Sequence, residues 1–125
     1  MTLEIRNLCI LALSIFCIAG TSLPASAHAG LEASMPVEGE SLEKSPKKIV
    51  LTFTEDIKVI STAVLNAEGQ KVGKTGRAIA DGTVLSIPLH EPLIDGTYKV
   101  DYQVVGLTDS HPIAGSIAFS IQSRR

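Results

Sequence analysis

The sequence predicts an all-β fold, a two-sheet β-sandwich of about seven strands. From residue 28 onward, apolar residues alternate with polar ones at a period of two, which indicates half-buried strands. Turn-forming residues interrupt this alternation at short intervals, as in sandwiches. No segment of helical length and amphipathic pattern competes, although residues 61–67 fit either a strand or a short helix.

Five segments carry the strand prediction. Residues 48–54 form a dense run of β-branched and aromatic residues, and residues 96–105 alternate strictly. Residues 117–121 repeat the alternation at the end of the chain, while residues 62–65 and 84–89 supply shorter strands. Turns are predicted at residues 36–39, 67–69, 81–82, 95–96 and 106–112.

Four aromatic rings fall inside these predicted strands. Phe53, Tyr98, Tyr102 and Phe119 alternate with polar neighbours. We therefore expect core packing for them rather than an exposed stacking surface.

The first 27 residues read as a secretory signal peptide. Arg6 precedes an apolar run over residues 8–18, and Ala25-Ser26-Ala27 is a small-residue cleavage site. The run is shorter than the roughly 20 residues of a membrane-spanning helix. Removing 27 of the 125 residues leaves 98, residues 28–125, enough for one small domain.

Cysteine content and charge exclude several classes. Cys9 and Cys17 both lie in the predicted signal, so the mature chain has neither thiol nor disulfide. The net charge is −2, and losing Glu4 and Arg6 leaves it unchanged. Nucleic acid is therefore not an expected partner, because the one basic run, residues 44–48, reads as a solvated loop.

His28 would be the first residue of the mature chain. A free N-terminal histidine offers its α-amino nitrogen and its ring Nδ1 to one metal ion, forming a chelate. Both nitrogens must be unprotonated, and an α-amino group has a pKa near ~8, so binding weakens as the pH falls.

A second candidate element is the segment from Thr108 to Pro112. In an extended chain, Asp109 and His111 would project to the same side, and Pro112 favours extended geometry at His111. With His28, this makes three nitrogens and one oxygen, a donor set that favours Cu(II). Two plainer interpretations stay open: the segment is only a turn, and an N-terminal histidine is an accident of cleavage.

At this point the chain resembles a known family, the CopC/PcoC copper-resistance proteins of the bacterial periplasm. The resemblance covers nearly the whole mature chain. It is carried by His28-Ala29, Ser34-x-Pro36, Leu51-Thr52-Phe53-Thr54-Glu55, Pro92-Leu93, Gly96-Thr97-Tyr98, Tyr102-Gln103-Val104-Val105, Asp109-Ser110-His111 and Gly115-Ser116.

The resemblance implies a cupredoxin-like Greek-key sandwich that holds one Cu(II) per chain. His28, Asp109 and His111 match the family's ligand positions, and Glu55 matches a glutamate near the metal, which implies an axial or outer role. From the sequence alone, Glu55 is an acidic residue at a strand end. The resemblance further implies a monomeric, non-enzymatic periplasmic carrier and a CopD-like inner-membrane copper transporter as partner.

The sequence departs from the family pattern in two places. Met35 is the only mature methionine, so we expect no Cu(I) site, which would need several soft thioether ligands. Tyr102 stands where the family usually has tryptophan, a change that keeps an aromatic core position. His90 matches no ligand position, and we expect it to be exposed.

Three functions remain in competition. The leading one is a Cu(II) carrier or buffer in copper homeostasis or resistance. A copper monooxygenase would share the N-terminal histidine chelate but needs an open coordination position, which Asp109 would fill. A metal-free immunoglobulin-like interaction module would share the fold, because fold alone does not define function.

Overall fold

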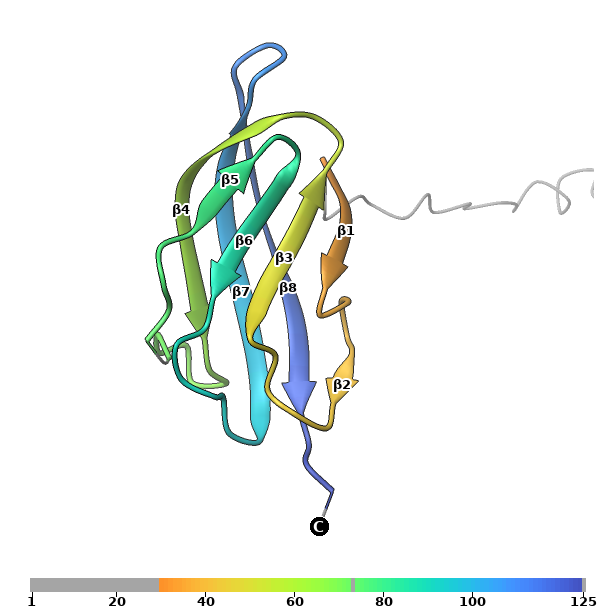
Figure 1. Ribbon diagram of the computed structural model, residues 1–125, viewed down its shortest axis with the longest axis vertical. Coiled ribbons are helices and arrows are strands. Elements are labelled where there is room, and N and C mark those ends of the chain that lie inside the picture. The colour runs from red at the N-terminus through yellow and green to blue at the C-terminus, as the bar shows by residue number, and fades with distance from the viewer. Residues whose placement is uncertain (1–29, 73, 125) are drawn as a thin grey trace, which may run out of the picture.

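The computed structural model describes residues 30–72 and 74–124, which form eight strands in two four-stranded sheets (Figure 1). The described residues contain no helix, and therefore no helix long and apolar enough to cross a membrane. The predicted two-sheet sandwich is therefore confirmed. The predicted signal peptide and His28 lie outside the described residues.

The first sheet has the strand order β1-β3-β6-β5. All neighbours are antiparallel, and β5 and β6 form a hairpin. The bounds are Leu31–Met35 for β1, Lys48–Phe53 for β3, Ile79–Asp81 for β5 and Val84–Pro88 for β6. The predicted strands at residues 48–54 and 84–89 are thus β3 and β6.

The second sheet has the order β2-β8-β7-β4. Its bounds are Ser41–Leu42 for β2, Ile57–Leu65 for β4, Gly96–Gly106 for β7 and His111–Ile121 for β8. The ambiguous residues 61–67 mostly belong to β4, which bulges between Val59 and Ser61 where it pairs with β7. The two-residue strand β2 runs parallel to β8.

The core lies between the two sheets. The inward residues alternate along each long strand, as in β7, where Tyr98, Val100, Tyr102 and Val104 are at most 4% exposed. Phe53 packs edge-on against Tyr102, and Tyr98 stacks on Phe119. The four predicted core aromatic residues are all buried.

Two outer strand edges are modified along their length. In β1, the register shifts between Leu31 and Ala33, and Pro36 follows the strand. Along β8, the carboxylate of Glu38 accepts the Ala118 N–H (2.9 Å), and Gly39 N–H donates to the Ala118 carbonyl (2.7 Å). The strand β2 then covers the end of β8.

One end of the sandwich gathers segments that are distant in sequence. Figure 1 shows the start of β1, the end of β3 and the β7–β8 loop at the same end. Gly30 lies just before β1, and its carbonyl accepts a hydrogen bond from the Thr54 N–H (2.9 Å). The chain entering β1 is therefore tied to the bend that follows β3.

Candidate metal centre

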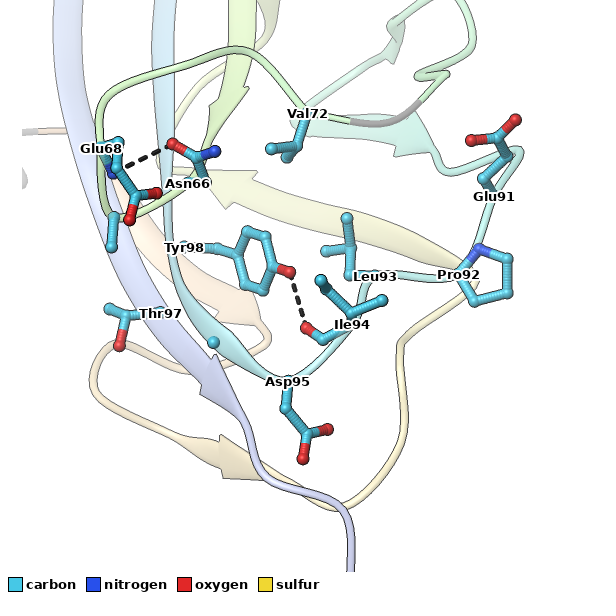
Figure 2. Close-up of a pocket in the computed structure, with 12 residues that line it drawn as sticks. Asn66, Glu68, Val72, Glu91, Pro92, Leu93, Ile94, Asp95, Thr97 and Tyr98 are labelled. Atoms are coloured by element: carbon cyan, nitrogen blue, oxygen red, sulfur yellow. Dashed lines mark hydrogen bonds between the residues drawn. The ribbon is translucent and has the colours of Figure 1, made fainter.

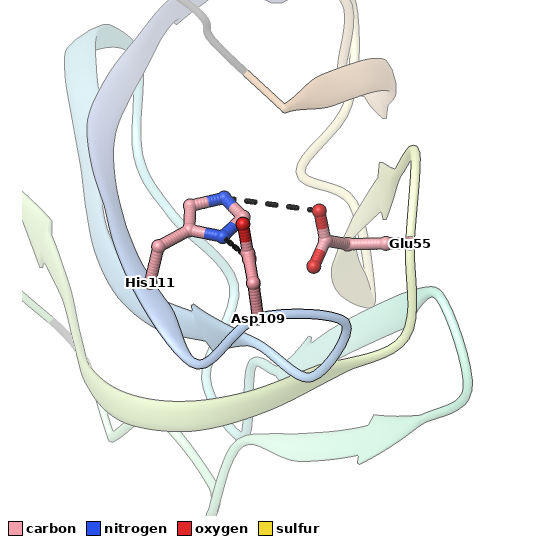
Figure 3. Close-up of side chains that lie close together, drawn as sticks. All are labelled: Glu55, Asp109 and His111. Atoms are coloured by element: carbon pink, nitrogen blue, oxygen red, sulfur yellow. Dashed lines mark hydrogen bonds and ion pairs between the residues drawn. The ribbon is translucent and has the colours of Figure 1, made fainter.

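Three polar side chains that are distant in sequence or lie on different segments meet at this end. Glu55 lies in the bend between β3 and β4, Asp109 lies in the β7–β8 loop, and His111 begins β8. Figure 3 shows the Asp109 and Glu55 carboxylates close to the His111 ring. His111 Nδ1 contacts Asp109 Oδ1, and His111 Nε2 lies 3.7 Å from Glu55 Oε2.

The loop geometry differs from the extended one expected for residues 108–112. Gly106 pairs with His111, so β7 and β8 close over a four-residue turn, residues 107–110. Ser110 has φ 56°, in the left-handed region that non-glycine residues rarely adopt. The prediction that Asp109 and His111 share an extended stretch is wrong. This turn, not strand alternation, brings their side chains together.

Backbone hydrogen bonds connect the Glu55 bend to the loop. Leu107 N–H donates to the Asp56 carbonyl (2.9 Å), and Thr108 N–H donates to Glu55 Oε1 (3.2 Å). These two contacts join segments about fifty residues apart in the chain. They bring Glu55 to the Asp109–His111 pair.

Sequence reasoning missed Gly106, which it treated only as a turn residue. A Cβ atom at this position would lie 2.6 Å from Glu55 Cδ and 3.0 Å from His111 Cε1. The missing side chain thus leaves room for the two groups. No local pattern in the sequence could reveal this, because Glu55 is far away in the chain.

The three side chains differ in exposure. The Glu55 side chain is 20% exposed, against 44% for His111 and 70% for Asp109. The pKa of His111 is raised above its usual value, first by the hydrogen bond to Asp109 and then by the charges of Asp109 and Glu55, while desolvation opposes the rise. The two carboxylates therefore stabilise the charged form of the imidazole relative to its neutral form.

The donor set suits a transition-metal cation. Within the described part of the chain, Glu55, Asp109 and His111 form the one group of three such residues whose ligand atoms all lie within 4.8 Å of one another. An imidazole nitrogen with carboxylate oxygens fits Cu(II), among other divalent ions. Such exposed acidic groups also occur without metal, so metal binding here stays a prediction.

The opposite end of the sandwich holds a cavity of about 450 Å³ that the sequence did not predict (Figure 2). Val72, Leu93 and Ile94 contribute apolar surface, and the Tyr98 hydroxyl donates to the Ile94 carbonyl (2.6 Å). His90 is exposed, as expected, and it follows β6 at this end.

The fold and the cluster together define a small β-sandwich domain with a candidate metal centre at one end. The chain belongs to the CopC domain family, whose match covers residues 31–122. It is similar to "Copper resistance protein C" of Escherichia coli, with 33% identity over 116 residues covering 84% of this chain and 90% of that protein.

Two further similarities extend this result. The crystal structure of CopC from Methylosinus trichosporium OB3b matches with a TM-score of 0.66 and 22% identity, covering 78% of this chain and 97% of that one. This likeness confirms the cupredoxin-like sandwich. "Copper transport protein CutJ" of Bacillus subtilis is 28% identical over 99 residues, which are 76% of this chain but only 18% of that protein.

Proposed function

We propose that the mature protein is a periplasmic Cu(II) carrier that holds one ion between its N-terminal His28 and the cluster at the end of the sandwich. His28 would supply the α-amino nitrogen and ring Nδ1, Asp109 an oxygen and His111 a nitrogen. Glu55 would be an axial or outer group. Copper is the cargo, so the proposed role is not enzymatic.

The observation that carries this proposal is the attachment of the chain's start beside the cluster. The Gly30 carbonyl accepts a hydrogen bond from Thr54, the residue before Glu55. A Cβ at Gly30 would lie 3.0 Å from Ile113 Cδ1, two residues beyond His111. His28 precedes Gly30 by two residues, a span of at most about 7 Å. This tether supports His28 as a ligand.

The chelate depends on cleavage after Ala27. In the precursor, the α-amino nitrogen of His28 forms a peptide bond with Ala27 and cannot act as an amine ligand. Export would therefore create the site as well as deliver the protein. The relatives named for copper resistance support copper as the cargo.

A membrane-bound copper transporter of the CopD kind is the proposed receiver or donor of the ion. CutJ supports this partner, because a segment similar to this chain forms only 18% of that larger copper transport protein. Whether the cell uses the carrier for import, resistance or storage depends on the direction of transfer.

The test is a Cu(II) titration of the protein beginning at His28, beside a version with one extra residue before His28. We expect one-to-one binding with nitrogen-rich tetragonal coupling in electron spin resonance for the first version. The extra residue should abolish the amine coordination and weaken binding. Equal, weak binding by both would contradict the proposal and favour a metal-free interaction module.

Thermal unfolding provides a second readout of the same titration. Copper that binds only the folded protein should stabilise it by about 4 kcal/mol when free Cu(II) exceeds Kd a thousandfold. An unchanged melting temperature would contradict the carrier function.

A further inference from the structure

The Glu55 carboxylate is held in one orientation by the β7–β8 loop. Its Oε1 accepts the Thr108 N–H at 3.2 Å, and its Oε2 lies 3.7 Å from His111 Nε2. One oxygen is therefore engaged with the loop backbone. The other is directed to the imidazole, as Figure 3 shows. With a side chain only 20% exposed, Glu55 is the least accessible member of the cluster.

This orientation requires the absence of a side chain at position 106. A Cβ there would lie 2.6 Å from Glu55 Cδ, closer than real Cβ contacts allow. The φ of Gly106 lies outside the left-handed region, so alanine fits the backbone. The clash falls on the end of a flexible side chain, so a methyl group would displace the carboxylate rather than unfold the strand.

We propose that Gly106 is a positioning residue for the Cu(II) site. By leaving space at the end of β7, it admits the Glu55 carboxylate between the Thr108 N–H and the His111 ring. Glu55 is then a pre-organised part of the site rather than a solvated strand-end acid. The inference rests on the proposed function for its effect on copper, but not for the geometry of the metal-free protein.

The first test uses metal-free protein and the amide NMR signal of Thr108. Gly106→Ala should shift this signal in the same direction as Glu55→Ala, because both remove the carboxylate from the Thr108 N–H. Gly115→Ala is the matched control. Its methyl group on the neighbouring strand would lie 2.8 Å from Tyr102 Cζ, away from the site. A Thr108 signal unchanged by Gly106→Ala would overturn the inference.

The second test is a double-mutant cycle on Cu(II) affinity, started from the protein that begins at His28. Removing a group behind a metal ligand costs about tenfold or more in affinity. We expect a loss of about tenfold for Glu55→Ala and for Gly106→Ala, with no further loss in the double variant. Additive losses, or a normal affinity in Gly106→Ala, would overturn the positioning role.

The two tests separate this inference from the proposed function. If the unaltered protein fails to bind Cu(II), the carrier proposal fails, and the Thr108 signal alone decides whether Gly106 positions Glu55. If the unaltered protein binds Cu(II), and Gly106→Ala has the same Thr108 signal and the same Cu(II) affinity as the unaltered protein, only the positioning inference fails.

Discussion

The two ends of the sandwich use polar side chains in different ways. At the cavity end, they bond to neighbouring backbone or to each other: Asn66 Oδ1 accepts the Glu68 and Gln70 N–H groups, and Asp95 accepts the Ser123 hydroxyl. At the opposite end, Glu55, Asp109 and His111 face one another across two connections. Local bonding of the first kind shapes loops, whereas convergence of the second kind brings together donor atoms of the type that metal ions bind.

The largest expected difference between the ends appears when one histidine is removed from each. His111→Ala should weaken Cu(II) binding by more than about a hundredfold, since losing even a group behind a ligand costs up to that much. His90→Ala is the matched control and should leave affinity unchanged, because His90 is exposed at the far end. Competition with a chromophoric chelator measures both.

Two outcomes would contradict the expected difference between the ends. Similar losses in both variants would indicate that copper binds histidines without regard to the cluster. No loss in His111→Ala would remove His111 from the site.

A smaller effect, on stability alone, is expected at the cavity end. Tyr98→Phe removes the hydrogen bond to the Ile94 carbonyl and should lower the free energy of unfolding by about 1 kcal/mol. The Cu(II) affinity should stay the same, because Tyr98 lies at the start of β7 and the cluster at its other end. Urea denaturation and the chelator competition test the two parts. A parallel fall in affinity would show that the two ends are coupled.

The smallest expected effect is on the protonation of His111. Asp109→Asn should lower the pKa of His111 toward its ordinary value, because Asp109 is the main cause of the rise. In the metal-free protein, the raised pKa adds stability below the unfolded-state pKa of histidine, and this stability is lost as the pH rises through the folded-state pKa. NMR titration of the His111 ring protons measures the change. An unchanged or higher pKa in the variant would contradict the assigned cause.

The sequence predicted the long strands better than it predicted the site. The alternation of apolar and polar residues predicted the positions of β3, β7 and β8, because each of these strands buries one face against the other sheet. The two-residue strand β2 was missed because it is too short for any period to show. Asp109 and His111 were correctly grouped, but through an extended geometry that the left-handed Ser110 replaces.

Glu55 shows why the remainder could not be predicted. A strand-end glutamate is usually exposed, and only the family resemblance suggested a place near the cluster. Its partial burial depends on Thr108 and Gly106, about fifty residues later in the chain. Contacts of that range depend on the pairing of β4 with β7, which local periodicity does not encode.

The irregular edge of β1 and the covered edge of β8 have a consequence for the protein in concentrated solution. Edge strands with free N–H and C=O groups invite other chains to add to the sheet and start aggregation. Here β1 is short, shifted in register and followed by a proline, while Glu38, Gly39 and β2 occupy the last part of the β8 edge. The residues that the structure describes include no cysteine, so no disulfide bond among them holds these edges closed. The short, irregular β1 and the contacts of Glu38, Gly39 and β2 with β8 therefore leave less free edge to which another chain could add.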